Sequence, residues 1–233
     1  MLGIWANFFA VIVGGGIGLL LKGGLPKRLQ GAINQALALC VLVIGVSGAI
    51  QTENAMIVIV CVVVGTLLGE LLRIERGIDR MANWAQSRLA KGENAFAEGL
   101  INATLLFSVG AMAVVGSLEA GLSGKADTLL AKSALDFTSS IIFASNFGAG
   151  VLCAAVPLTI YQGAIALLAG ALSPLLTEEL INEMSAVGSV LIIGLSFNML
   201  HLTRERIPVG NMLPAMLAPI AYFPLAHWVE ALF

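Results

Sequence analysis

The sequence predicts an all-α polytopic membrane protein with about eight transmembrane helices. Of its 233 residues, 58% are hydrophobic and only 11% are charged, and the mean hydropathy is +0.95. A soluble domain carries roughly 25% charged residues. The apolar residues are gathered in runs close to the ~20 residues that a helix needs to cross the hydrocarbon core. We therefore expect one transmembrane domain over residues 1–233, surrounded by membrane lipid and with little chain in water.

The same composition argues against several functional classes. The formal net charge is −2 and no basic tract stands out, so a nucleic acid is not an expected partner. Cys40, Cys61 and Cys153 lie inside apolar runs without CxxC spacing, which predicts neither a metal site nor a disulfide framework. Neither an HExxH motif nor a Walker loop is present. We expect no enzyme and no cofactor.

Eight apolar runs define the predicted spans. No basic region precedes the first run, so we interpret it as a retained span and not as a cleaved signal. The boundary between the fifth and sixth spans depends only on Pro157. In chain order the predicted spans are Leu2 to Leu21, Gly31 to Gln51, Ala55 to Leu72, Ala95 to Leu118, Asp136 to Ala155, Thr159 to Leu176, Ser185 to Leu202 and Met212 to Leu232.

The segment 73–91, between the third and fourth spans, has a different pattern. Its apolar residues recur at helical spacing while the intervening positions are charged or polar. This pattern is typical of an amphipathic helix that lies in the membrane interface, with Trp84 at the edge of its apolar face.

Basic residues predict the orientation, because Lys and Arg in short loops stay on the cytoplasmic side. With eight spans, the basic residues that follow the first, third and seventh spans share one side, and both termini lie outside. These residues are Lys22, Lys27, Arg28, Arg73, Arg76, Arg80, Arg88, Lys91, Arg204 and Arg206. A seven-span chain would place the last two on the opposite side.

Internal repeats link the first four spans. VIVGGGIGLLLK at 11–22 matches VVVGTLLGELLR at 62–73, and each copy holds one pair of glycines four residues apart, Gly14 with Gly18 and Gly65 with Gly69. Small residues at this spacing let membrane helices approach closely. The segment 31–48 matches 99–116 in the same register. The segments 11–48 and 62–116 therefore predict a duplicated helical hairpin, whose glycine faces could also join a homo-oligomer.

A polar stripe in the fifth span is the main candidate site. At ~100° per residue, Asp136, Ser139, Ser140 and Asn146 fall on one face of a helix. Polar groups in hydrocarbon cost several kcal/mol unless they are satisfied, so this face should look toward other helices or a wet cavity. One interpretation is interhelical packing, with Lys132 neutralising the carboxylate. The other is a solute or ion site.

Further polar groups could share that site. Asn102, Gln162 and Asn198 lie inside apolar runs, where their amides could bind a solute or cross-link helices. The last span contains Pro214, Pro219 and Pro224, each of which removes a backbone donor. The carbonyls left free there could coordinate an ion. Glu70 and Glu98 lie near span ends and are expected to be interfacial carboxylates.

An intramembrane serine protease is a remote alternative. The segment 45–48 has the GxSG form of the rhomboid nucleophile motif, and His227 follows an alanine as a base might. Four positions in a glycine-rich apolar chain arise easily by chance, and Glu230 stands where the motif needs glycine. A serine near a helix end is the ordinary interpretation.

With these features in place, the chain resembles a bacterial family of small integral membrane proteins of unknown function (YqgA-like), some of which carry a transport label. The resemblance covers essentially the whole chain. It rests on the glycine-rich first span, the turn from Lys22 to Arg28 and the R-I-E stretch from Arg73 to Glu75. It implies an inner (plasma) membrane location and carries over no site residue.

The sequence thus favours a transporter or channel for a small solute or ion. The alternative is a non-transporting membrane scaffold or assembly protein. The two differ in whether the polar face of the fifth span looks into water.

Overall fold

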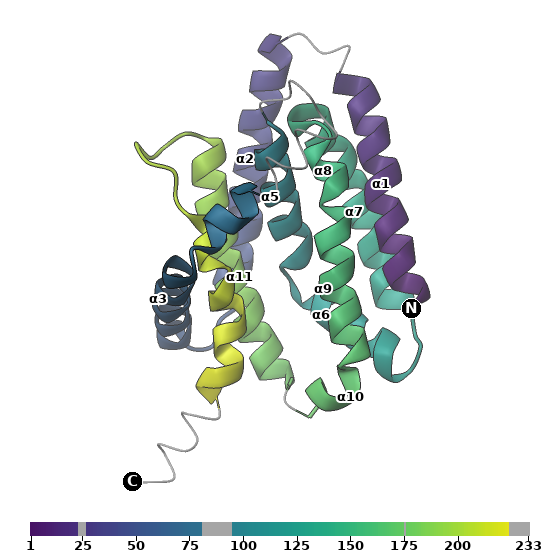
Figure 1. Ribbon diagram of the computed structural model, residues 1–233, viewed down its shortest axis with the longest axis vertical. Helices are drawn as coiled ribbons and strands as arrows, with labels where there is room; N and C mark the ends of the chain where they lie inside the picture. Colours follow the sequence, from purple (N-terminus) through teal and green to yellow (C-terminus); the bar gives the residue numbers. More distant parts are fainter. Residues whose placement is uncertain (23–26, 81–94, 175, 224–233) are drawn as a thin grey trace.

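The computed structural model describes residues 1–22, 27–80, 95–174 and 176–223, and within these ranges the regular structure is helical (Figure 1). The helices are α1 (Leu2–Lys22), α2 (Lys27–Ala49), α3 (Ala55–Leu72), α5 (Phe96–Ser108), α6 (Ala111–Leu122), α7 (Asp127–Phe147), α8 (Gly150–Cys153), α9 (Ala155–Leu167), α10 (Ala169–Leu172), α11 (Glu178–Met199) and the 3-10 helix η1 (Val209–Leu217). Short helical segments at 74–80 and 218–223 follow α3 and η1.

The predicted fold class is confirmed. Five helical segments in the described residues are long and apolar enough to cross a membrane, namely Leu2–Leu21, Gly31–Ala49, Ala55–Leu72, Gly150–Leu167 and Glu178–Met199. α5 and α6 make a sixth when the pair, bent by 65°, is taken as one broken span. The count of eight stays a prediction, which would need α7 and the segment 209–223 as the other two.

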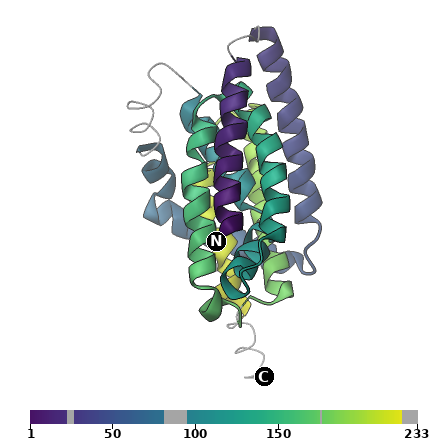
Figure 2. The same ribbon diagram turned by 90° about the vertical axis from the view of Figure 1, so that its right-hand side faces the viewer.

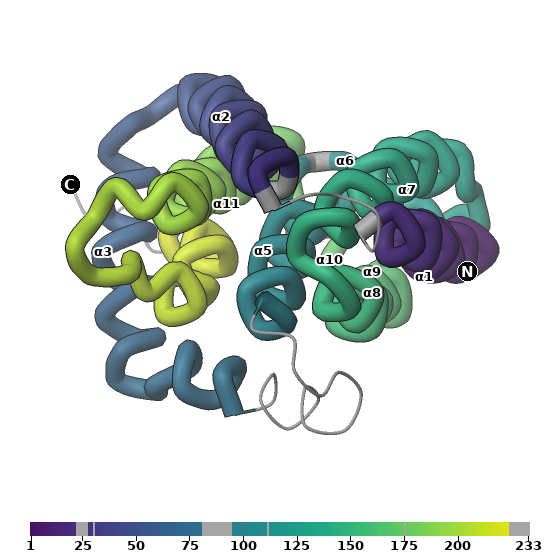
Figure 3. Tube along the Cα trace, turned by 90° about the horizontal axis from the view of Figure 1, so that it is seen from above, coloured from purple at the N-terminus to yellow at the C-terminus, as the bar shows by residue number. Residues whose placement is uncertain are grey.

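The helices form two groups that lie side by side (Figure 3). In the first group α1 packs mainly on α7 and α9, and α6 packs on α9. In the second group α2 packs mainly on α11, and α3 packs mainly on η1. α5 lies between the groups in Figure 3 and contacts members of both. The main hydrophobic core joins the two groups, since its buried residues come from α1, α2, α3, α5, α7, α9, α11 and η1.

Glycines fix the direction of the closest helix pairs. Gly3, Gly14 and Gly18 of α1 lie against Leu129, Phe137 and Ile141 respectively, so α1 and α7 run parallel. Figure 2 shows α1 lying across α7 and α9. In the second group the order is reversed, because Gly65 lies on Ala215 and Gly69 lies on Asn211. α3 and η1 therefore run antiparallel.

The repeat copies do not fold as separate hairpins. α1 and α2, which form the first copy, belong to different groups and have different main partners. α3 of the second copy joins the second group, while α5 packs mainly on α8. Each copy is therefore stabilised by helices from the later part of the chain.

The predicted fifth span has the wrong boundaries. α7 runs from Asp127 to Phe147, and the chain turns at Gly148, whose φ of 81° favours glycine. Pro157 lies inside the helical segment Gly150–Leu167, three residues after the break at Ala154 between α8 and α9, so it does not separate two spans. Lys132 and Asp136 lower the mean hydropathy of the first half of α7, so the predicted span starts too late. With the observed boundaries, Asp136 lies near the middle of a 21-residue helix.

The predicted fourth span, Ala95 to Leu118, is not continuous. α5 ends at Ser108, Val109 is extended, and Gly110 has a φ of 114° before α6 begins. The prolines of the last predicted span differ, since Pro214 lies inside the 3-10 helix η1, whereas Pro219 lies in the first turn of the α-helical segment 218–223. Pro224 and residues 81–91 of the predicted interfacial helix lie outside the described residues, whereas 74–80 is helical.

Candidate functional site

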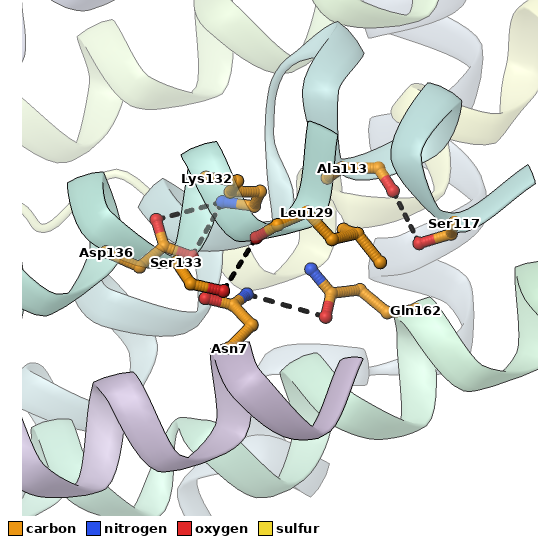
Figure 4. Close-up of polar contacts among 8 residues, drawn as sticks. All are labelled: Asn7, Ala113, Ser117, Leu129, Lys132, Ser133, Asp136 and Gln162. Atoms are coloured by element: carbon orange, nitrogen blue, oxygen red, sulfur yellow. Dashed lines mark hydrogen bonds and ion pairs between the residues drawn. The ribbon is translucent and has the colours of Figure 1, made fainter. Parts of the chain in front are cut away.

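A buried ion pair lies at the centre of the first helix group (Figure 4). Lys132 Nζ is 2.9 Å from Asp136 Oδ1 and 2.7 Å from Oδ2. The two residues are one turn apart on α7, so they share a face, and only 6% and 5% of their surfaces are exposed. A charge away from water is stable only when it is paired and hydrogen-bonded. The pairing that the sequence suggested for Lys132 and Asp136 is therefore present.

Two amides from neighbouring helices complete this arrangement. Asn7 of α1 is fully buried and lies between Asp136 and Gln162 in Figure 4. Its Nδ2 donates a long hydrogen bond, 3.4 Å, to Gln162 Oε1 on α9. The close approach that brings Asn7 here follows from the small residues of α1, because a Cβ at Gly3 would lie 2.7 Å from Leu129 Cβ.

Several polar atoms in this region have no hydrogen-bond partner among the described residues. They are Asn7 Oδ1, Gln162 Nε2 and Ser140 Oγ, the last one turn along α7 from Asp136. Each belongs to a residue that is at most 1% exposed. A buried polar group without a partner costs about 1–3 kcal/mol. We call Asn7, Lys132, Asp136, Ser140 and Gln162 the central polar cluster.

The remaining predicted site residues lie elsewhere. Asn146 Nδ2 donates to Asn34 Oδ1 at 2.8 Å, and Asn34 Nδ2 donates to the Met199 carbonyl at 3.2 Å, so Asn146 helps to join α7, α2 and α11. Asn198 pairs with the backbone of Ile207.

For two further members of the predicted set, Ser139 and Asn102, the described residues show no side-chain hydrogen bond of this kind. Ser139 is half-buried, at the edge of the polar face. Asn102 is 1% exposed, and its Nδ2 has no partner in the described part of the chain. The structure thus joins Asp136, Ser140 and Gln162, and separates them from Asn146 and Asn198.

Two pockets lie outside the central polar cluster. The larger, of about 330 Å³, is lined by Glu98, Asn198, His201, Thr203, Arg204 and Arg206. Of the predicted site residues it includes only Asn198. The smaller, of about 10 Å³, adjoins the break between α5 and α6 at Ser108 and Gly110 and reaches Tyr161 of α9. Such a volume is about the size needed for one water molecule.

Asn7 and Glu183 are polar residues whose burial sequence reasoning missed. Asn7 is the only amide inside an otherwise apolar first span, and that isolation is a signal that could have found it. Glu183 falls between the predicted sixth and seventh spans, but α11 begins at Glu178, so Glu183 lies inside the helix and is 1% exposed. Its carboxylate accepts bonds from Thr52 Oγ1 at 2.7 and 2.9 Å and from the Glu53 amide at 2.9 Å.

A second acidic region joins α3 to η1. Asn211 Nδ2 donates to Glu70 Oε2, and the Glu75 amide donates to Asn211 Oδ1 at 2.7 Å. Glu75 lies beyond the end of α3, and its partial burial raises the pKa of its carboxyl. The positive charge of Arg206 opposes that shift, and the negative charges of Asp79 and Glu70 add to it.

The glycine pairs have partners inside the chain. A Cβ at Gly14 or Gly18 would fall on the carbonyl oxygen of Phe137 or Ile141, and one at Gly69 would fall on that of Asn211. These faces are covered by helices of the same chain, so a homo-oligomer would need other surfaces.

The GxSG segment belongs to a packing surface. Gly45 and Gly48 of α2 lie against Ile193 and Ser189 of α11, while Ser47 is exposed. His227 lies outside the described residues.

The fold and these sites define a multi-pass, all-helical membrane protein with ionisable side chains enclosed in its bundle. The chain belongs to the family described as "Protein of unknown function (DUF554)", which it matches over residues 2–223. It is 32% identical to "Uncharacterized membrane protein YdfK" of Bacillus subtilis, over 97% of each chain. It is 30% identical to "Uncharacterized protein YqgA" of Escherichia coli, over 93% of this chain and 94% of the relative. No solved structure matches it.

Proposed function

We propose that this protein is a transporter or channel for a small polar solute or ion, and that the central polar cluster is part of its pathway. The observation that supports this most is the burial of Lys132 and Asp136 near the middle of α7. Ionisable residues inside a bilayer are rare and commonly mark solute or ion pathways.

The unsatisfied amide atoms add a second argument. Pure helix packing would favour amides whose donors and acceptors are all used. Here Asn7 Oδ1 offers an acceptor and Gln162 Nε2 offers a donor, and the Asn7 side chain lies between Gln162 and Asp136 of the ion pair. A ligand with one donor and one acceptor would satisfy both atoms, and it could bind to Asp136 or Lys132 when the pair opens.

The arrangement of helices suggests how the cluster would be reached. Transporters commonly place their sites beside broken helices and move one helix group against another. The break at Ser108 to Gly110 and the 3-10 helix η1 both contribute to the small pocket, through Gly110 and Met216. That pocket also contains Tyr161, the residue next to Gln162 in α9. A relative movement of the two groups would then expose the cluster.

Flux into liposomes tests this proposal. The purified full chain is reconstituted, and ion conductance under an imposed potential is measured together with osmotic swelling in a panel of small polar solutes. We expect flux above that of empty liposomes, lost in Asp136→Asn, and retained in Thr138→Ala, whose side chain is exposed on the opposite side of α7.

A scaffold or assembly protein is the rival, and the complete Lys132–Asp136 pairing favours it. A scaffold predicts flux no greater than that of empty liposomes, and loss of stability as the only effect of Asp136→Asn. Wild-type flux in a folded Asp136→Asn variant would also contradict the proposed site.

A further inference from the structure

The larger pocket lies at the end of the bundle where α5 begins and α11 ends. Glu98 comes from the first turn of α5, Asn198 comes from the last turn of α11, and the other lining residues come from the segment 200–208. In Figure 1 this segment projects at the upper left of the molecule, beyond the end of α11. The volume of about 330 Å³ falls in the range of small-molecule sites.

The pocket has a positive lining. Arg204 and Arg206 bring two permanent charges, His201 adds an imidazole, and Glu98 is the only acidic residue among the described residues that line the pocket. Within the described residues, neither guanidinium nor the imidazole makes a salt bridge or a side-chain hydrogen bond, although the Glu75 carboxylate attracts Arg206. Guanidinium groups bind phosphate or carboxylate oxygens in bidentate fashion, so this lining has donors available for an anion.

The segment that carries the arginines is held in place. Asn198 Nδ2 donates to the Ile207 carbonyl at 2.9 Å, and the Ile207 amide donates to Asn198 Oδ1 at 2.8 Å. This pair of bonds fastens the segment to the end of α11. A site formed in advance loses less entropy when a ligand binds.

His201 occupies a position that normally favours glycine. Its φ is 52°, and the Leu202 amide donates to the Phe197 carbonyl, which is the bond that closes a helix with a left-handed residue. Glycine would adopt this conformation without steric cost. A non-glycine residue in the left-handed region is often found at functional sites, and the His201 side chain lines the pocket.

The start of α5 also suits an anion. Ala95, the residue before the helix, makes no side-chain hydrogen bond to the first turn. The free amides and the dipole at a helix N-terminus favour negative charge. Glu98 meets part of this preference, and it would compete with a bound anion.

We propose that this pocket binds a phosphate group, with Arg204 and Arg206 as its direct ligands and Thr203 as a hydroxyl donor. His201 adds an imidazole N–H donor, Asn198 positions the segment, and Glu98 weakens binding by repulsion. The phosphate could belong to a free solute or to the headgroup of an acidic phospholipid. The proposal concerns binding at the basic end of the bundle and does not depend on transport.

Binding of inorganic phosphate to the detergent-solubilised full chain provides the first test, by calorimetry and by thermal unfolding. We expect Arg204→Gln and Arg206→Gln each to weaken binding roughly tenfold, since each removes charge-assisted hydrogen bonds. Glu98→Gln should tighten binding, because it removes a negative charge from the same pocket. Lys125→Gln, an exposed basic residue outside the pocket, is the matched control and should change nothing.

Vesicles distinguish the two sources. The full chain is reconstituted in phosphatidylcholine with or without phosphatidylglycerol, and the thermal midpoint is measured. A midpoint raised by phosphatidylglycerol in wild type, and not in Arg204→Gln, identifies a lipid headgroup. A midpoint raised only by inorganic phosphate identifies a free solute.

Glu98→Gln keeps the test informative if an arginine variant fails to fold. The proposal is overturned if wild type binds neither probe, or if folded arginine and Glu98→Gln variants bind both probes as wild type does. The arginines would then serve only to orient the chain in the membrane.

Discussion

The α1–α7 and α3–η1 contacts use the same repeated motif and produce different chemistry. Gly14 with Gly18, and Gly65 with Gly69, hold corresponding places in the two copies. The first pair seats a parallel α-helix and the second seats an antiparallel 3-10 helix. Two small residues one turn apart make a groove for a backbone, and they do not specify which backbone fills it.

The polar residues of the two copies lie at different positions along α1 and α3. Asn7 in α1 corresponds to Val58 in α3, whereas Glu70 in α3 corresponds to Leu19 in α1. The first copy therefore places an amide beside the buried ion pair of α7. The second places a carboxylate near the end of its helix, where Asn211 bonds to it. The two matching strings thus share a packing surface and differ in their polar residues.

Filling the glycine grooves should have the largest effect on the stability of the fold. Gly69→Leu and Gly14→Leu would each force a side chain onto a backbone carbonyl, which no rotamer change can relieve. Overpacking of a core typically costs about 1–3 kcal/mol when side chains can shift. Here the clash is with the backbone of the partner helix, so we expect the chain not to fold, which is seen as lost folded yield in detergent.

Gly16→Ala is the matched control within α1, since nothing lies within 4 Å of the added Cβ. It should leave the yield unchanged. An unchanged gel-filtration profile for Gly69→Leu would contradict close packing between α3 and η1.

Removing one partner of the ion pair should have the next largest effect. Asp136→Asn leaves the Lys132 ammonium buried without a carboxylate, and breaking such a pair costs about 3–5 kcal/mol, less if the lysine becomes neutral. Thermal unfolding in detergent measures the loss. The double variant Lys132→Met with Asp136→Leu removes both charges, so it should recover most of the stability without recovering flux. Equal instability of the single and double variants would contradict a true pair.

The acidic contact of the second copy should matter less. Glu70 is exposed, so water screens its interaction with Asn211. Glu70→Gln keeps an acceptor for Asn211 Nδ2, and we expect a change in unfolding free energy below about 1 kcal/mol. A loss of stability as large as that of Asp136→Asn would show that the polar contacts beside the two copies contribute equally to stability.

The smallest expected effect is a pH dependence at Glu75. Burial raises the pKa of this carboxyl, so the folded state binds the proton more tightly than the unfolded chain does. The stabilisation is present below the ordinary pKa and is lost as pH rises through the folded value. Glu75→Gln should remove this slope, which begins near the ordinary pKa of a glutamate, about 4.3, and extends above it. Arg206→Gln should steepen it, because Arg206 lowers the pKa of Glu75. An identical slope in wild type and Glu75→Gln would contradict this assignment.

Hydropathy was enough to predict the fold class, because a chain with so few charges must hide its backbone in helices. The glycine spacing likewise predicted where helices meet. It could not predict their partners, because Gly14 and Gly65 sit in nearly identical strings. The boundaries failed at α7, where Lys132 and Asp136 lowered the local hydropathy although they neutralise each other in the fold.

The site was predicted only in part for a related reason. A helical wheel places Asp136, Ser140 and Asn146 on one face of α7. This helix is 21 residues long, so the same face contacts different helices at different positions along its length. Asn146 meets Asn34 of α2, and Asp136 lies in the cluster that contains Asn7 of α1. Contacts between distant helices decide which residues share a site, and a single sequence does not contain them.

The central claim, that the polar face of α7 lies on a water-accessible pathway, is tested most directly by thiol labelling at Ser140. In a chain whose three cysteines are replaced, Ser140→Cys is exposed to a membrane-impermeant thiol reagent in intact membranes. Lys125→Cys provides an exposed positive control, and Thr138→Cys reports the opposite side of α7. If the polar face of α7 lies on a water-accessible pathway, Ser140→Cys is modified while Thr138→Cys is not. Full protection of Ser140→Cys, with complete labelling of Lys125→Cys, would show that the central polar cluster is sealed and serves only to hold the helices together.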